Sequence, residues 1–447
     1  MTSSLSGFPE LLPAQRFVEL TVIDRLRETF ELHGFAPLET RAVEPLETML
    51  RKGEIDKEVY ILRRLHADTD EPDAGLGLHF DLTVPFARYV LENAGHLEFP
   101  FRRYQIQKVW RGERPQTGRY REFVQADIDV IDRDALAPHH DVEVARVMAE
   151  ALSRLEFLPR VRLQLNNRKL IEGFLRGLGA GDIPAVMRAI DRLDKAPVDV
   201  VRRQLVDDAG LTVDQAESCL RLAEIRSVDD AFVGRVRELG VSHDLLDEGL
   251  DELAAVLRGC EGIDHDRVLV EADLRIARGL DYYTGTVFET RMDGFEALGS
   301  ICSGGRYDSL ATDGKVTYPG VGISLGVTRM LMPLFQQGVL SSSRAVPSAV
   351  LVALPSDDKR IDCEAIAQAL RRRGIATEVA ASPHKYGKQI RYAERRGIPF
   401  VWFPQDADKR DQVRDIRSGE QVDADADAWQ PPRRDLRPEV TSQRVEQ

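Results

Sequence analysis

Several features of membrane-bound and exported proteins are missing from this 447-residue sequence. It has no run of about 18 apolar residues, so we expect no transmembrane helix. Its first residues lack the basic segment followed by an apolar segment that marks a secretory signal. Only four cysteines are present and no two form a Cys-x-x-Cys pair, which argues against a disulfide framework or a zinc ribbon. The sequence therefore predicts a protein of the reducing cytoplasm with no membrane partner.

Two common nucleotide-binding signatures are also missing. The chain contains neither the Gly-x-x-x-x-Gly-Lys-Ser/Thr loop of P-loop proteins nor the Gly-x-Gly-x-x-Gly spacing of dinucleotide-binding proteins. The adjacent His139 and His140 could not both reach one metal ion from a strand, because neighbouring side chains point to opposite faces. We therefore predict no metal site built from the chain's own side chains.

What is present describes an acidic globular protein. Hydrophobic residues make up 43% of the chain, charged residues make up 30%, and the net charge is −13. This profile is typical of a folded chain and argues against a protein that coats nucleic acid through an overall basic surface. Binding of nucleic acid through a local basic surface stays open.

At roughly 150 residues per domain, the length suggests about three domains. Periodic apolar residues predict an acidic helical insertion between two regions of alternating, strand-like sequence. A small polar linker at 337–347 precedes a β-α-β-α-β pattern, which predicts an α/β domain with a mostly parallel sheet, and the polar end of the chain predicts disorder. The predicted divisions are 1–166 and 261–336 for a domain of sheet and helices, 167–260 for the insertion, 345–421 for the α/β domain and 422–447 for a disordered tail.

Residues 101–131 predict an antiparallel hairpin with one polar face. Residues 103–111 and 120–131 can form strands on either side of a loop rich in glycine and proline. Alternation along the second strand places a mixed set on one face: Arg121, Phe123, Gln125, Asp127 and Asp129. Since Gln125 and Asp129 offer an amide and a carboxylate, we expect them to bind a small ligand.

Basic side chains are crowded into the same hairpin. Residues 101–125 contain seven of them against two glutamates: Arg102, Arg103, Lys108, Arg111, Arg114, Arg119 and Arg121. Guanidinium groups match phosphate oxygens, and Arg111 and Arg121 on neighbouring strands could clamp a polyphosphate. The alternative is a surface hairpin held together by ion pairs.

Three glycine-containing segments lie between residues 278 and 329. In Arg278–Gly285, the arginine could hold a carboxylate or a phosphate, although a tight turn between strands is the simpler interpretation. Ser303–Asp308 predicts a glycine turn, which either lets the backbone approach a ligand or merely precedes a helix. Residues 320–329 predict a strand entering a helix, with Arg329 in the first turn where phosphate is favoured.

A second basic surface is predicted at residues 384–396. Lys388, Arg391 and Arg395 share one face of a helix by their spacing. Together with nearby tyrosines they could bind single-stranded RNA through charge and stacking. A solvated helix face is the alternative.

Taken together, these segments resemble the histidine–tRNA ligase family of class II aminoacyl-tRNA synthetases. The segment FRRYQIQKVWRGERPQTGRYREFVQADID resembles the second class II motif, RGLDYYTG and SGGRYD resemble two histidine-specific signatures, and GVGISLGVTR resembles the third motif. The resemblance runs from about residue 7 to 420. It implies an α+β fold, with an antiparallel sheet of six or seven strands, helices, a helical insertion and a C-terminal α/β anticodon-binding domain.

The resemblance also implies where ATP binds. ATP would lie bent across the sheet, with Arg111 at its α-phosphate and Arg329 at the γ-phosphate end. Glu113, Arg119 and Arg121 would assist around the nucleotide. Mg²⁺ would accompany the polyphosphate as part of the substrate.

For L-histidine, the resemblance implies a separate set of contacts. Asp81 and Thr83 would meet the amino group, Gln125 and Arg278 the carboxylate, and Asp129 and Tyr283 the imidazole, with Tyr282 beside them. Arg278 and Arg111 would act as the catalytic residues, because both would neutralise charge that develops during the reaction.

Partners follow from the same resemblance. Arg114 and Gln116 would approach the acceptor end of tRNA(His), and Lys388 and Arg391 would lie in the anticodon-binding domain. A homodimer is implied, and Arg41 occupies a position in the first motif where the family usually has proline. One alternative is a histidine-binding regulatory paralogue of ATP phosphoribosyltransferase, although such paralogues generally lack RGLDYYTG and the C-terminal domain. A second alternative is an RNA-binding protein that uses only the fold, and the complete set of arginines expected to hold ATP argues against it.

Overall fold

The computed structural model describes residues 5–50, 58–65, 75–277, 283–406 and 409–443. The chain forms two compact units. The first comprises Met1–Pro9 and Val22–Pro333, and the second comprises Glu10–Thr21 and Leu334–Gln447.

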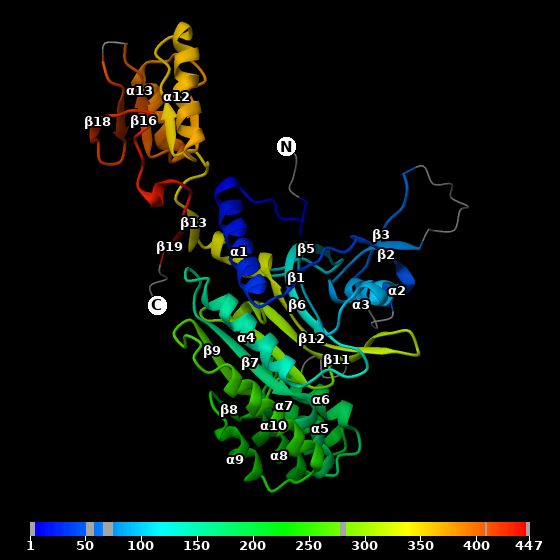
Figure 1. Ribbon diagram of the computed structural model, residues 1–447. Helices are drawn as coiled ribbons and strands as arrows, with labels where there is room; N and C mark the ends of the chain where they lie inside the picture. Colours follow the sequence, from blue (N-terminus) through cyan, green and yellow to red (C-terminus); the bar gives the residue numbers. More distant parts are fainter. Residues whose placement is uncertain (1–4, 51–57, 66–74, 278–282, 407–408, 444–447) are drawn as a thin grey trace. The chain divides into compact units, whose positions relative to one another are not determined.

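A nine-stranded mixed sheet forms the centre of the first unit (Figure 1). Its strands, in spatial order, are β1 (Ala36–Pro37), β5 (Phe101–Trp110), β6 (Glu122–Ile131), β12 (Thr317–Gly326), β11 (Cys302–Thr312), β10 (Thr286–Met292), β7 (Val161–Asn167), β9 (Val268–Asp273) and β8 (Arg226–Ser227). Neighbours are antiparallel except for β1 with β5 and β7 with β9. The predicted α+β fold is confirmed. The two-residue edge strands β1 and β8 account for the excess over the six or seven strands expected, because periodicity cannot reveal strands so short.

The two faces of this sheet differ because side chains alternate along each strand. On one face, Ala126, Ile128 and Val130 of β6 are buried opposite apolar residues of β12. This face packs against α4 (His139–Ser153), in which Val144 and Val147 are also buried. On the other face, polar side chains of β6 stand opposite small residues of β12 in three register pairs: Gln125 with Gly326, Asp127 with Ser324, and Asp129 with Gly322. This second face is called the polar face below.

The glycines of Ser303–Asp308 lie within strand β11, so the predicted turn is wrong. A Cβ atom on Gly304 would lie 2.1 Å from the carbonyl oxygen of Gly322, and one on Gly305 would lie 2.7 Å from the ring of Tyr283. Both glycines are therefore required by close approach of neighbouring groups rather than by a change of chain direction.

Helices from the segment 167–260 pack beside β7 and β9 (Figure 1). They are α5 (Arg168–Gly177), α6 (Ile183–Asp191), α7 (Val198–Asp207), α8 (Val213–Ala223), α9 (Ala231–Arg237) and α10 (Asp244–Gly259), with the 3-10 turn η2 (Arg192–Asp194). Glycines bring α5 and α10 together, since a Cβ on Gly173 would lie 2.2 Å from the backbone nitrogen of Leu246. The predicted helical character of this segment therefore matches the structure.

The remaining elements of the first unit are a small second sheet and several short helices. A small sheet contains β2 (Val43–Pro45), β4 (Leu76–Leu78) and β3 (Tyr60–Ile61). The helices are α2 (Leu46–Leu50), α3 (Thr83–Asn93), η1 (Ala94–His96) and η3 (Glu296–Leu298). Two helices contribute to both units, α1 (Pro13–Leu32) and α11 (Val327–Gln336).

The second unit contains a five-stranded mixed sheet in the order β15, β14, β16, β17, β18. The strands are β15 (Thr377–Val379), β14 (Val350–Val352), β16 (Phe400–Phe403), β17 (Gln412–Asp415) and β18 (Gln421–Asp423). The first three are parallel, as predicted, and the last two are antiparallel. The helices are η4 (Asp357–Lys359), α12 (Arg360–Arg372), α13 (Tyr386–Arg396) and η5 (Arg433–Asp435).

The prediction that residues 422–447 are disordered is wrong for the described part, which ends at residue 443. The Trp429 ring packs edge-on against Phe400 and Trp402 at centroid distances of 5.2 and 5.7 Å. Further along, β19 (Val440–Ser442) pairs with β13 (Leu340–Ser342), so part of the predicted linker is also a strand. Polar composition is misleading here because a few contacts distant in sequence hold the segment in place.

Candidate active site

A cavity of about 160 Å³ lies over the polar face, between the β5–β6 loop and the start of α11. It brings together five residues predicted for ATP or histidine: Arg111, Glu113, Arg119, Gln125 and Arg329. Small side chains and glycine of β11 and β12, such as Ser303, Ser324 and Gly326, form its floor. The cavity is thus rimmed by cationic groups and has space above the sheet for a ligand.

The arginines of this rim are held by a backbone carbonyl oxygen, an aromatic ring or a carboxylate. Arg111 Nε donates to the carbonyl oxygen of Phe80 at 3.0 Å, and its guanidinium lies 5.1 Å from the centre of the Phe123 ring. Arg119 Nη1 donates to Glu113 Oε2 at 3.0 Å. Arg329 lies in the first turn of α11, where helix N–H groups favour an anion. The rim can therefore present fixed cations to a polyphosphate.

Arg121 does not line this cavity, although it was predicted to clamp a phosphate together with Arg111. The two residues are neighbours, since the Arg111 backbone N–H donates to the Arg121 carbonyl at 2.9 Å. However, Arg121 Nε donates to the carbonyl oxygen of Glu113 at 3.1 Å, and the side chain packs against Gly7. Residue 121 precedes the first residue of β6, so alternation along the strand does not set its direction.

Three of the seven basic residues of the hairpin form structural ion pairs instead of facing the cavity. The pairs are Arg102 Nε with Glu143 Oε1 at 2.7 Å, Arg103 Nη2 with Asp129 Oδ2 at 2.6 Å, and Lys108 Nζ with Glu122 Oε1 at 2.6 Å. The ion-pair alternative for the hairpin is therefore correct for these three. Arg111 and Arg119 line the cavity and therefore remain candidates for binding phosphate.

Deeper on the polar face, Asp129 is buried and held on both sides. Its Oδ2 accepts from Arg103, and its Oδ1 accepts from the Tyr307 hydroxyl at 2.9 Å. Gly322 stands directly opposite, and a Cβ there would lie 2.0 Å from Asp129 Oδ1. The predicted imidazole ligand is therefore a fixed carboxylate, and sequence reasoning assigned no role to Arg103 or Tyr307.

Asp127 lies between Asp129 and the cavity. Burial raises the pKa of Asp127 to about 7, with Asp129 and Asp81 also raising it, while Arg103 and a hydrogen bond from Ser324 lower it. The Ser324 hydroxyl in turn accepts from Gln125 Nε2 at 2.7 Å. A polar chain therefore joins the cavity to the buried carboxylates. Asp127 received no role in the prediction, although it shares the alternation of Gln125 and Asp129.

Asp81, Thr83 and Tyr283 complete the described part of the predicted histidine set. Asp81 Oδ1 accepts from the backbone N–H of Val84 at 3.0 Å, and Thr83 begins α3. Burial, and then the charges of Asp129 and Asp81, raise the pKa of Tyr283. This electrostatic coupling links Asp81 and Tyr283 to Asp129 on the polar face, and Thr83 follows Asp81 by two residues.

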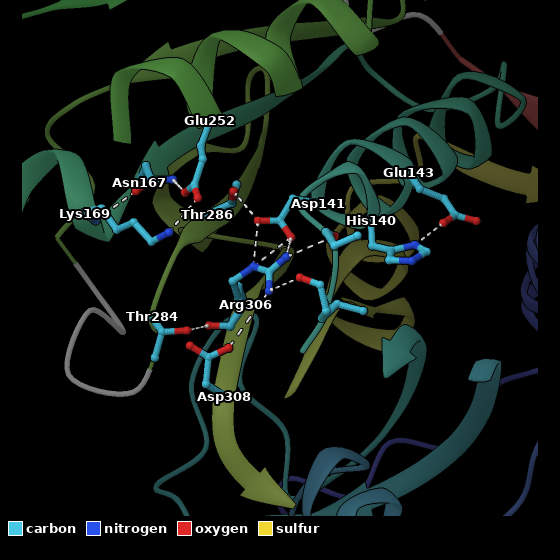
Figure 2. Close-up of polar contacts among 12 residues, drawn as sticks. His140, Asp141, Glu143, Asn167, Lys169, Glu252, Thr284, Thr286, Arg306 and Asp308 are labelled. Atoms are coloured by element: carbon cyan, nitrogen blue, oxygen red, sulfur yellow. Dashed lines mark hydrogen bonds and ion pairs between the residues drawn. The ribbon is translucent and has the colours of Figure 1, made fainter. Parts of the chain in front are cut away.

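Arg278 and Tyr282 lie outside the described residues, but the segment that follows them is anchored firmly (Figure 2). The backbone N–H of Thr284 donates to the carbonyl oxygen of Arg306 at 2.8 Å. The Arg306 side chain pairs with buried Asp141 at 2.9 Å, and Thr286 Oγ1 donates to the same carboxylate at 2.6 Å. This network was missed from the sequence, even though Arg306 belongs to the quoted SGGRYD segment.

The residues predicted to contact tRNA are all exposed. Arg114 and Gln116 lie on the β5–β6 loop, where Gln116 and Arg119 form a backbone bridge. Lys388 and Arg391 lie on the exposed side of α13 in the second unit. Exposure leaves these side chains available to a partner.

Two searches of the described residues gave no further site. No group of three or more His, Cys, Asp or Glu side chains in the described ranges could hold a metal ion. None of the helices in that part of the chain is long and apolar enough to cross a membrane.

Comparison with known proteins matches both units. The family model for histidyl-tRNA synthetase matches residues 7–330, and the model for an anticodon binding domain matches residues 349–428. Proteins named histidine–tRNA ligase from Cutibacterium acnes and Micrococcus luteus are 61% and 57% identical, and each alignment covers 98% of both chains.

Solved structures show the same relation. The crystal structure of histidyl-tRNA synthetase from Nostoc sp. is 34% identical, with a TM-score of 0.85, covering 96% of this chain and 97% of that one. A Bacillus halodurans structure described as an ATP phosphoribosyltransferase regulatory subunit/histidyl-tRNA synthetase is 21% identical with a TM-score of 0.70, which shows a shared fold alone. On the family model and the near full-length relatives, this chain belongs to the histidyl-tRNA synthetase family.

Proposed function

We propose that the protein attaches L-histidine to tRNA(His) in two steps at the polar face. In the first step the histidine carboxylate attacks the α-phosphate of ATP, forming histidyl-adenylate and releasing diphosphate. In the second, a ribose hydroxyl of the tRNA attacks the adenylate and releases AMP. The observation that carries this proposal is the continuity between an arginine-rimmed cavity and buried carboxylates, joined through Gln125 and Ser324.

The cavity side suits ATP. In-line attack on a phosphate needs positioning and charge neutralisation more than proton transfer. Arg111 would hold the α-phosphate, Arg329 would hold the γ-phosphate end, and Arg119 with Glu113 would border the nucleotide. Arg121 would help only by supporting the Glu113 backbone, given its contact there. Mg²⁺ bound with ATP would neutralise polyphosphate charge, and Glu113 is the carboxylate on the cavity wall that fits such an ion.

The buried side suits histidine. Asp81 and Thr83 would meet the ammonium group, Gln125 would meet the carboxylate, and Asp129 with Tyr283 would meet the imidazole. A site of fixed polar groups rejects side chains that leave those groups unpaired. Arg278 would meet the reacting carboxylate and stabilise charge in the transition state, with Tyr282 beside the ligand.

Transfer to tRNA would use exposed groups at two places. Arg114 and Gln116 would approach the acceptor end beside the cavity, and Lys388 and Arg391 would contact the anticodon region. We propose a homodimer acting in the cytoplasm, where the four cysteines, all buried thiols without a disulfide, would remain reduced.

The regulatory alternative has less support. Relatives named histidine–tRNA ligase align over nearly the full length, and the C-terminal segment matches the anticodon-domain model. A regulatory protein that only binds histidine would have no use for the arginines around the cavity.

Histidine-dependent exchange of pyrophosphate into ATP tests the proposal, with the wild type compared with Arg278→Ala. We expect strong exchange in the wild type and its loss in the variant. Histidine binding without exchange in the wild type would favour the regulatory alternative, and neither binding nor exchange would refute the proposed site.

A further inference from the structure

Arg103 is a buried cation that has no direct role in the proposed reaction. Its side chain is 0% exposed, so it cannot reach a phosphate in the cavity as the crowded basic hairpin suggested. Burying a guanidinium costs free energy unless the charge is paired. A guanidinium at this buried position therefore requires a partner of opposite charge.

That partner is Asp129, which stands directly opposite Arg103 in the pairing of β5 with β6. The ion pair is 2.6 Å long, and the Arg103 guanidinium also lies 4.3 Å from the centre of the Phe86 ring. Both residues sit within ten-residue strands. The geometry of the pair is therefore set by a rigid part of the sheet rather than by a loop.

The second oxygen of Asp129 is also fixed, because the Tyr307 hydroxyl donates to it. Gly322 leaves no side chain above this oxygen. Each carboxylate oxygen has two lone-pair sites, so one hydrogen bond to each oxygen does not exhaust the acceptor capacity of a carboxylate. Arg103 and Tyr307 thus set the orientation of the Asp129 carboxylate.

The electrostatic surroundings show why a cation is needed. Asp127 on the same strand and Asp81 before α3 are buried carboxylates of this region, and Tyr283 and Tyr307 face it with phenol groups. Neighbouring carboxylates favour protonation of one another. Arg103 opposes this effect, since it lowers the pKa of Asp127 and forms the ion pair with Asp129.

We propose that Arg103 is a positioning residue for histidine recognition, which keeps Asp129 ionised and oriented to accept a hydrogen bond from an imidazole N–H. This inference rests on the proposed function. Arg103 does not touch the substrate and acts through Asp129. A histidine analogue without an N–H donor, such as thiazolylalanine, would leave the fixed carboxylate unpaired and be rejected.

Arg103→Gln tests this by removing the charge while keeping a polar side chain. Without the cation, burial and the neighbouring carboxylates favour the protonated form of Asp129, which is a poor acceptor, increasingly as the pH falls. We expect the KM for histidine in pyrophosphate exchange to rise about tenfold or more near pH 6.5 and to recover toward pH 8.5, while the KM for ATP stays near the wild-type value. Arg103→Lys restores the charge but not the planar guanidinium fork, so it should return the pH profile toward that of the wild type and leave a smaller, pH-independent rise in the KM for histidine alone.

Arg102→Gln is the matched control. Arg102 precedes Arg103 on β5, points to the other face and pairs with Glu143 at 2.7 Å. Its substitution removes an ion pair of the same kind away from the polar face. We expect both KM values and the pH profile of histidine use to remain those of the wild type.

The outcomes of these exchange measurements distinguish the proposed function from the proposed role of Arg103. Absence of exchange in the wild type would overturn the proposed function itself. With an active wild type, an unshifted pH profile in Arg103→Gln, or equal increases in both KM values, would overturn the role of Arg103. If Arg103→Gln does not fold, Arg103→Lys decides: selective weakening for histidine over ATP, with weaker rejection of thiazolylalanine, supports the role, and equal weakening refutes it.

Discussion

The two halves of the candidate site use charge in different ways. In the nucleotide half, Arg111 and Arg119 remain 31% and 49% exposed and come from a strand end and a loop. In the histidine half, Arg103 and Asp129 are 0% and 4% exposed and lie inside strands. The same hairpin therefore carries partly exposed arginines where we propose that the polyphosphate binds, and a buried ion pair where we propose that histidine binds.

This difference follows from what each ligand requires. A polyphosphate is large and strongly charged, so cations around an open cavity can attract and hold it. An imidazole is small and only weakly charged at neutral pH, so selectivity requires acceptors fixed before the ligand arrives. Gln125 lies where the two halves meet, which is where the histidine carboxylate and the α-phosphate would react.

The largest expected effect comes from breaking the nucleotide half with Arg111→Ala. Removing one fixed charge from the reacting phosphate should lower kcat for pyrophosphate exchange about 100- to 1,000-fold. Lys108→Ala, which removes a more exposed cation of the same strand, should leave exchange nearly unchanged. Similar losses of exchange activity in both variants would mean that Arg111 contributes no more to the reaction than a surface charge does.

The histidine half can be broken separately with Asp129→Asn. The carboxamide removes the charge that pairs with Arg103, so kcat/KM for histidine should fall about 10- to 100-fold. An uncompensated buried guanidinium should also lower the free energy of unfolding by about 3 kcal/mol. Steady-state kinetics and urea denaturation measure the two effects, and an unchanged KM for histidine would contradict the assignment.

The pH dependence of stability provides a further test of the comparison. Asp127 lies in the buried histidine half, and burial raises its pKa. With a pKa of about 7 in the folded protein, Asp127 retains a proton that the unfolded chain releases above its ordinary value near 4. Its contribution to stability is therefore lost as pH rises from about 4 to 7. Relative to Asp127→Asn, the wild type should lose a few kcal/mol of unfolding free energy over that range.

The control for this measurement is Asp251→Asn, since Asp251 is an exposed carboxylate on α10 of the same unit. The difference between this variant and the wild type should not change with pH over the same range. If the difference in unfolding free energy between Asp127→Asn and the wild type also does not change with pH, burial does not raise the pKa of Asp127.

The smallest effect is expected outside both halves, on α13. Substituting Lys388 and Arg391 with alanine removes two exposed charges, which should raise the KM for tRNA a few-fold, with a shallower salt dependence. Pyrophosphate exchange does not require tRNA and should stay at the wild-type rate. Equal loss of exchange and charging would instead indicate a general defect in folding.

The hairpin shows what the sequence can and cannot predict. Alternation correctly placed Gln125 and Asp129 on one face, because strand periodicity is a local property. It could not show that Arg103 pairs with Asp129 while Arg111 faces the cavity, because that depends on the register between two strands. Residue type alone could not separate Arg103 from Arg111 among the basic side chains of the hairpin.

Glycine and polar composition were misleading for a related reason. Gly304 and Gly305 were interpreted as a turn, whereas close approach of Gly322 and Tyr283 requires them inside a strand. The polar tail was interpreted as disordered, whereas Trp429 packs on the second sheet and Arg417 pairs with Asp435 at 2.6 Å. In both places the deciding contacts join residues that are distant in sequence.

The most direct test of the two-part site is to measure kcat, the KM for ATP and the KM for histidine in pyrophosphate exchange for the wild type, Arg111→Ala and Asp129→Asn. The account predicts histidine-dependent exchange in the wild type, a defect in ATP use for Arg111→Ala, and a defect confined to histidine for Asp129→Asn. Exchange that is absent in the wild type, or defects shared equally by both ligands in both variants, would contradict it.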